Sequence, residues 1–170
     1  MATPPVPPPD PPGSPVPVST RRLITDAQFT SCVAVVADNN PDMSRDMSGR
    51  IVEEALKFMV ACAAYPNAGL APSRIVDEGW HALILHTAVY AELCDSLGSF
   101  VHHFPGWDPT HHDPAILDRT RSLIGECGYA ADPELWGPPT DTLLVAVAAK
   151  CQHAPECTIR PMPTPQPPVN

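Results

Sequence analysis

Two carboxylates and an imidazole lie close together in a stretch that is otherwise apolar, Ile75 to Tyr90. Asp77 and Glu78 precede His81 by four and three residues. In a helix, which turns about 100° per residue, both carboxylates lie one turn before the imidazole and on either side of it. Burying such groups without partners costs several kcal/mol, so the fold must supply partners for them. The three side chains therefore form a polar face of the kind that binds a divalent metal or transfers protons.

Glu78 and His81 have the Glu-x-x-His spacing that carboxylate-bridged metal bundles use. A two-metal bundle needs a second copy of this pair. The other glutamates weighed as ligands, none with a histidine three residues later, are Glu53, Glu54, Glu92 and Glu126. A two-iron centre is therefore disfavoured. A structural role stays open, because the helix dipole stabilises carboxylates in the first turns and His81 could be a hydrogen-bonded core residue.

A second source of nitrogen ligands is His102-His103, which directly follows the helix expected here. Adjacent residues of an extended segment point to opposite sides, so one imidazole can turn back toward His81. Together with Asp77, these imidazoles suit Zn²⁺ or Fe²⁺. A carboxylate of the Asp77 and Glu78 pair that does not bind the metal would orient His81 or act as a general base.

Other histidines are left open as ligands. His86 is five residues after His81 and about 140° away around a helix, so we expect it to face a groove or another helix. His111 and His112 lie in a proline-bounded loop and could line an entrance. Asp113 is expected to cap the helix that follows this loop, which occupies its carboxylate.

The cysteines indicate core positions more than a metal site. Six are spread along the chain, and in a reducing compartment those within predicted helices are usually small buried hydrophobic residues: Cys32, Cys62 and Cys94. Cys151, His153 and Cys157 offer three donors, but structural zinc prefers closer cysteines and four ligands. A labile metal site, a redox pair and ordinary thiols all remain open there.

Apolar spacing predicts helices over about 26–38, 45–64, 73–97 and 114–126, with a further one over 141–150, where the valines leave a strand open. The segment 73–97 is apolar on most of its circumference, which is typical of a central helix. No alternating strand pattern of useful length appears elsewhere. The sequence therefore predicts an all-α fold, a small helical bundle around one long central helix.

Proline marks both ends of the chain, which holds 24 prolines in 170 residues. Residues 1–19 and 160–170 are expected to be disordered, Pro-rich tails with a polyproline-II bias, and 20–159 to form one helical domain. The tails contain PxxP matches, which any proline run produces, so binding of an SH3-like protein partner stays open.

The net charge of −9 argues against binding to nucleic acid or to an anionic membrane surface, since both require a clustered basic surface. No apolar run approaches the ~20 residues of a membrane span. The first residues lack the basic-then-apolar order of a secretory signal. We therefore expect a cytoplasmic protein.

Residues 76–94 and 98–105, together with 129–136, carry a resemblance to a known family. Their Asp-Glu-x-Trp-His and Phe-x-His-His-x-Pro patterns resemble the bacterial members of the glycine-rich domain-containing-protein-like family. The family's marked polar positions correspond to Asp77, Trp80, His81, His102 and His103. The resemblance implies a helical domain and no named reaction. The glycine-rich extension of the eukaryotic members is absent from this chain, so interaction roles based on it do not transfer.

The leading hypothesis is a small helical metal-binding protein, or a metal-dependent enzyme of hydrolytic or oxidative type acting on a small molecule or peptide. Trp80 and Tyr90 would be scaffold, with Trp80 as a wall of the pocket. The alternative is a non-catalytic helical adaptor, in which the polar cluster fixes helix packing and the Pro-rich tails recruit partners. The sequence leaves the metal, the substrate and the oligomeric state open.

Overall fold

The computed structural model describes residues 19–103 and 113–137. The predicted Pro-rich tails, apart from Ser19, and the predicted helix over 141–150 lie outside the described residues. So do five of the candidate ligands: His111, His112, Cys151, His153 and Cys157.

All regular elements in these two ranges are helical, and no strand is present in either. They are a 3₁₀ helix, η1 (Thr20–Leu23), and the α-helices α1 (Asp26–Asn39), α2 (Arg45–Ala64), α3 (Arg74–Leu85), α4 (Thr87–Leu97), α5 (Ile116–Glu126) and α6 (Pro133–Trp136). The predicted all-α class is confirmed. None of the described helices is both long enough and apolar enough to cross a bilayer.

Side-chain caps fix the start of the first three α-helices. The Thr25 hydroxyl accepts the backbone N–H of Gln28 at 3.2 Å, and the Gln28 side chain accepts the N–H of Thr25 in return. Ser44 and Ser73 cap α2 and α3 in the same way through their hydroxyls. Each cap satisfies a backbone donor that has no partner inside the helix.

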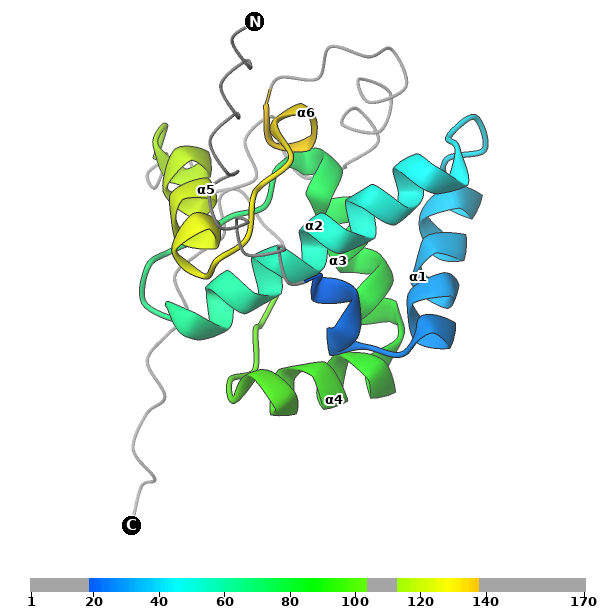
Figure 1. Cartoon of the computed structure of the whole chain (residues 1–170), viewed down its shortest axis with the longest axis horizontal. Coiled ribbons are helices and arrows are strands. Elements are labelled where there is room, and N and C mark those ends of the chain that lie inside the picture. Colours follow the sequence, from blue (N-terminus) through cyan, green and yellow to red (C-terminus); the bar gives the residue numbers. More distant parts are fainter. Residues whose placement is uncertain (1–18, 104–112, 138–170) are drawn as a thin grey trace, which may run out of the picture.

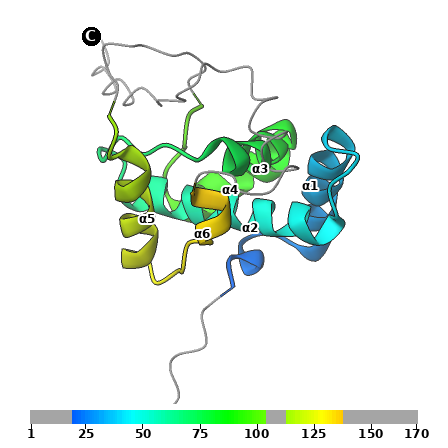
Figure 2. The ribbon, with the colours of Figure 1, turned by 90° about the horizontal axis from the view of Figure 1, so that it is seen from above.

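The bundle is organised about α2 and α3, which cross near the middle of the molecule (Figure 1). Around α2 pack η1, α1, α4 and α5, while α3 also contacts α1, α4 and α6. Seen from above, α5 and α1 lie at opposite ends of α2 (Figure 2). The centre of the bundle is therefore a crossed pair of helices.

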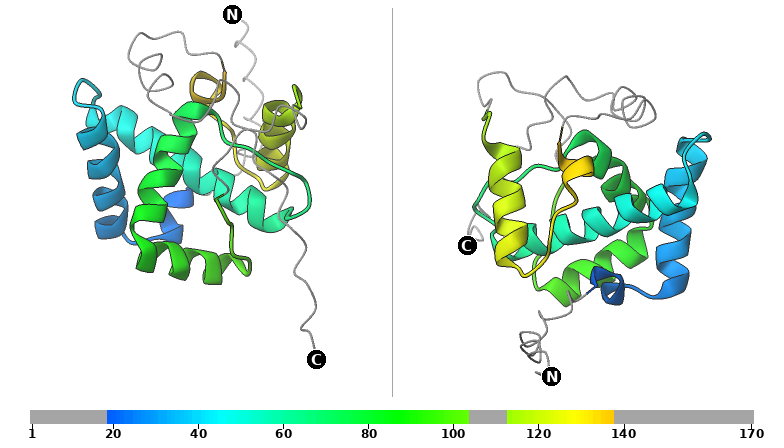
Figure 3. Two further views of the ribbon diagram at one scale, coloured as in Figure 1. Left: turned by 180° about the vertical axis from the view of Figure 1, so that it is seen from behind. Right: turned by 45° about the horizontal axis from the view of Figure 1, so that its top comes forward.

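The predicted single helix over 73–97 is wrong in one respect, since the segment forms two helices that meet at His86. There φ is −89° and ψ is 67°, outside the helical region. The Nδ1–H of His86 donates to the Ala82 carbonyl at 2.7 Å, and the backbone N–H of His86 donates to the Leu83 carbonyl at 3.1 Å. The side chain thus takes the carbonyl that the next helical turn would have used. As a result α4 leaves the end of α3 at a steep angle (Figure 3, left).

Asp113 is close to its predicted role, although α5 begins two residues later than expected. Its carboxylate accepts the N–H of Ala115 at 2.9 Å and pairs with Arg119 at 2.7 Å. The helix itself starts at Ile116. The carboxylate is occupied at the helix entrance, as the sequence indicated.

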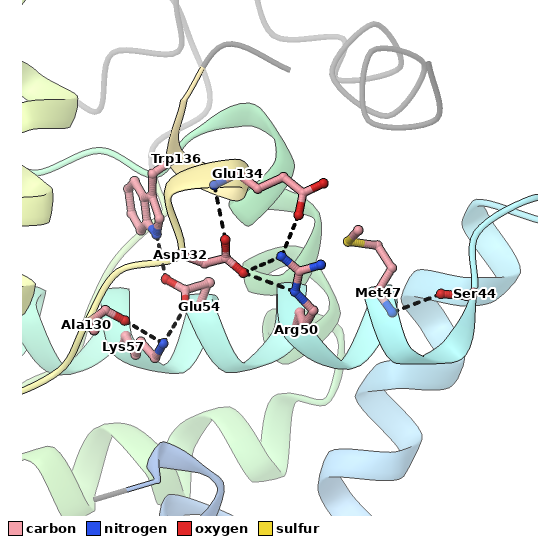
Figure 4. Close-up of polar contacts among 9 residues, drawn as sticks. All are labelled: Ser44, Met47, Arg50, Glu54, Lys57, Ala130, Asp132, Glu134 and Trp136. Atoms are coloured by element: carbon pink, nitrogen blue, oxygen red, sulfur yellow. Dashed lines mark hydrogen bonds and ion pairs between the residues drawn. The ribbon is translucent and has the colours of Figure 1, made fainter. Parts of the chain in front are cut away.

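The last described segment is fastened to α2 by charged side chains from one face of that helix (Figure 4). Arg50 pairs with Asp132 and with Glu134, at 2.6 Å in both cases. One turn later, Glu54 accepts the indole N–H of Trp136 at 2.6 Å. Lys57 in turn pairs with Glu54. The contacts of Arg50 with Asp132 and Glu134, and of Glu54 with Trp136, join residues more than 80 positions apart in the chain.

The described cysteines are free thiols at or beside the core. Cys32 and Cys94 are buried, as predicted, while Cys62 is partly buried against the core. Burial raises the pKa of Cys32 to about 11. Because only the thiolate is a good nucleophile, this thiol is chemically inert at neutral pH although an imidazole nitrogen of His86 lies 3.7 Å away.

Cys32 is therefore expected to resist alkylation in the native protein. At pH 8, a thiol whose pKa is about 11 is ionised in about one molecule in a thousand, and its burial also blocks the reagent. Peptide mass spectrometry after treatment with iodoacetamide should find Cys32 unmodified in native protein and fully modified in urea. Rapid labelling of the native protein at this residue would contradict the packing described for α1.

Candidate metal centre

Asp77, His81 and His103 meet beside the middle of α3. Asp77 and His81 come from successive turns of that helix, whereas His103 belongs to the segment that follows α4. One ligand atom from each of the three residues can be chosen so that all lie within 4.8 Å of one another. The Nε2 atoms of the two histidines are 3.0 Å apart.

The carboxylate of Asp77 spans both imidazoles. Its Oδ1 lies 3.6 Å from Nε2 of His103, and its Oδ2 lies 3.7 Å from Nδ1 of His81. The side chain of Asp77 is 2% exposed, that of His103 19% and that of His81 31%. The carboxylate therefore forms the floor of the cluster, and the imidazoles form the rim that solvent can reach.

The donor set fits a divalent transition metal. Two imidazole nitrogens and one carboxylate oxygen are common ligands of zinc and of non-haem iron(II). Two ligands held about 2.1 Å from a tetrahedral ion lie about 3.4 Å apart. The His81–His103 and His103–Asp77 separations, 3.0 and 3.6 Å, bracket that value. With one ligand atom from each residue, the three atoms lie within 4.8 Å of one another, so the side chains must draw together to bind such an ion.

Aromatic rings hold His103 in place. Its imidazole lies between the indole of Trp80 and the imidazole of His81, with ring centroids 4.7 Å away in both cases. The indole is itself fixed in the core by Phe58, in an edge-on contact at 5.0 Å. Trp80 therefore forms a wall of the cluster, in keeping with the scaffold role expected for it.

The structure brings some of the predicted site residues together in the cluster and leaves others outside it. It confirms that one histidine of the 102–103 pair turns back to His81, and that residue is His103. His102 is exposed on the other side of the segment, with its ring against Phe100 at 4.7 Å. His86 also lies outside the cluster, because its side chain bonds to the Ala82 carbonyl at the junction of α3 and α4. Glu78 is half-buried and does not belong to the cluster, so its catalytic role stays a prediction.

One residue that positions the site was not singled out from the sequence. Gly79 lies on α3 where this helix crosses α2, and a Cβ atom there would be 2.6 Å from the carbonyl oxygen of Ile51. The available signal was a glycine inside a strongly apolar helical stretch, which often marks a close backbone approach. The contact fixes how far α3 lies from α2, and with it the position of Asp77 and His81.

Comparison with known proteins gives one family and no activity. No curated protein and no solved structure matches the chain. The model of the UCP032817-like family matches residues 19–113, a range that contains all three members of the cluster. The resemblance to the glycine-rich domain-containing-protein-like family stays a prediction. Because the match covers more than half of the sequence, the chain belongs to the UCP032817-like family.

Proposed function

We propose that this protein binds one divalent metal ion, Zn²⁺ or Fe²⁺, through Asp77, His81 and His103. The observation that carries the proposal is the meeting of a buried carboxylate with two imidazole nitrogens from separate parts of the chain. Exposed acidic clusters are common on protein surfaces without any metal, but this carboxylate is buried and its partners are half-buried. Such a mixed donor set is characteristic of transition-metal sites.

Three protein ligands leave a coordination position open, which is the arrangement of catalytic zinc sites. An ion held by these three residues would supply a Lewis acid, and solvent can reach the cluster beside His81. Asp77 would also orient the imidazole of His81 through its second oxygen. Glu78, one residue further along α3, is the candidate general base. These features support a hydrolytic or oxidative enzyme for a small molecule or peptide.

The cysteines support a cytoplasmic location for the protein. The four cysteines in the described residues are free thiols at or near the core, which suits a reducing compartment. Recruitment of a protein partner through the Pro-rich tails remains a prediction from the sequence.

The test is metal analysis of full-length protein purified without a histidine tag. We expect close to one equivalent of bound metal, and a higher melting temperature when Zn²⁺ or Fe²⁺ is added, because a ligand of the native state stabilises it. His81→Ala should lower the affinity by at least about 100-fold, since losing a ligand costs more than losing a residue that orients one. Isothermal titration calorimetry measures this change.

His102→Ala is the matched control, since it removes the neighbouring imidazole that lies outside the cluster. It should bind metal like the wild type, and both variants should keep the helical circular-dichroism spectrum. A wild-type protein that folds normally, contains no metal and gains no stability from either ion would refute the proposal. The cluster would then be a hydrogen-bonded polar core, as the adaptor alternative requires.

A further inference from the structure

The hydroxyl of Tyr90 joins three parts of the chain that build the candidate metal centre. Tyr90 is a buried residue of α4, the helix that follows the break at His86. Its oxygen accepts the indole N–H of Trp80, on α3, at 3.0 Å. Its proton is donated to the carbonyl of Val101, in the segment that carries His103. One phenol group therefore ties the wall of the cluster to the backbone that presents its third member.

From these contacts we infer that Tyr90 is a positioning residue, which holds His103 against Trp80 and beside His81. The inference rests on the proposed metal site and names the residue that sets its geometry. The anchored carbonyl is only two residues before His103, so a shift at Val101 moves the imidazole directly. The indole of Trp80, against which the His103 imidazole packs, is held by the same hydroxyl.

Removing the hydroxyl takes away the partner that the Trp80 indole N–H and the Val101 carbonyl share. The groups beside the hydroxyl, the Met59 sulfur at 3.5 Å and the Cys94 thiol, form only weak hydrogen bonds. Water has little access, because Tyr90 is 5% exposed and Trp80 and Val101 are buried. An unpaired donor and an unpaired acceptor in the core are costly, so the segment 101–103 is expected to move until both find partners. Burial also raises the pKa of Tyr90, so the phenol keeps its proton, and the donated bond persists at any pH of physiological relevance.

The aromatic ring of Tyr90 makes a separate packing contact that a phenylalanine would preserve. Phe100 packs against it in an edge-on contact, with centroids 5.6 Å apart. Tyr90→Phe therefore removes the hydroxyl and leaves the ring packing in place. This makes the variant a specific probe of the two hydrogen bonds.

The experiment compares Tyr90→Phe with wild-type protein and with Tyr65→Phe, all as full-length, metal-free chains. Tyr65→Phe is the matched control because it removes a hydroxyl that bonds to Glu126 at 3.1 Å, outside the cluster. The first readout is the nuclear Overhauser effect between the ring protons of Trp80 and His103, which requires no metal. The second is the dissociation constant for Zn²⁺.

We expect Tyr90→Phe to lose the Trp80–His103 Overhauser effect and to bind Zn²⁺ about 10- to 100-fold more weakly, as for other residues that orient metal ligands. Tyr65→Phe should match the wild type in both. An unchanged Overhauser effect in Tyr90→Phe overturns the inference, whatever the affinity. If that effect is lost but wild-type protein binds no metal, Tyr90 positions His103 and the proposed metal function fails.

A second measurement covers the case in which Tyr90→Phe does not fold. In wild-type protein, a buried hydroxyl held by two hydrogen bonds should exchange slowly enough to give its own proton resonance. We expect this resonance to show an Overhauser effect to the indole N–H of Trp80. Its absence would overturn the inference without any variant.

Discussion

Replacing Lys57 with methionine is expected to lower the free energy of unfolding by about 3 kcal/mol. Lys57 neutralises Glu54, whose side chain is 3% exposed, and also donates to the carbonyl of Ala130 at 2.8 Å (Figure 4). Methionine keeps the length of the side chain but leaves the buried carboxylate with the indole N–H of Trp136 as its remaining partner among the described residues. Removing one partner of a buried ion pair typically costs about 3–5 kcal/mol, and the 19% exposure of Lys57 places this case at the lower end.

Urea denaturation followed by circular dichroism measures the change. Arg121→Met is the control, because its partner Asp118 is 74% exposed and such pairs contribute about 0–1 kcal/mol. The double variant in which Lys57→Met is combined with Glu54→Gln should recover part of the loss, since the amide carries no charge. A loss below about 1 kcal/mol in Lys57→Met would mean that the pair is hydrated and does not fasten the segment 130–136 to α2.

Gly79→Ala is expected to destabilise the fold by about 1 kcal/mol, and by about 2 kcal/mol at most, and to weaken metal binding with it. The new methyl group would lie 2.6 Å from the Ile51 carbonyl and 3.0 Å from the Cβ atom of Ala55. Neither atom can rotate away, so α3 must move off α2. Overpacking of this kind costs about 1–3 kcal/mol, against a gain of about 1 kcal/mol from the helix propensity of alanine. Moving α3 also moves Asp77 and His81 relative to His103.

The same substitution at another helical glycine isolates this effect. In Gly49→Ala, on α2, the added methyl group would meet only the ring of Phe29 at 4.0 Å, an ordinary contact. We expect its stability to equal or exceed that of the wild type by up to about 1 kcal/mol. Thermal unfolding and Zn²⁺ titration of both variants check the prediction. Equal stability of Gly79→Ala and Gly49→Ala would contradict the close crossing of α2 and α3.

Local interactions explain what could be predicted from the sequence. The starts of α1, α2 and α3 depend on Thr25, Ser44 and Ser73, each of which bonds to a backbone N–H three residues away. Asp77 and His81 face one another because both lie on one helix, four residues apart, and helical geometry alone brings them together. The all-α class follows in the same way from apolar spacing within single segments.

Other features depend on contacts between residues that are distant in the chain. Alternation along an extended segment restricts the choice to one histidine of a pair, and the contacts of His103 with His81 and Trp80 show which one it is. Arg50 pairs with Asp132, which lies 82 positions later in the chain, and no local sequence pattern predicts this contact.

The sequence by itself determined the starts of α1, α2 and α3 and the shared face of Asp77 and His81, because covalent spacing and hydrogen bonds within a few residues suffice for both. Only the tertiary structure decided that the long apolar segment breaks at His86, where a side chain competes successfully for a backbone carbonyl. It also decided that Asp77 joins the cluster and Glu78 does not, because the packing of α3 on α2 sets which side of the helix faces His103.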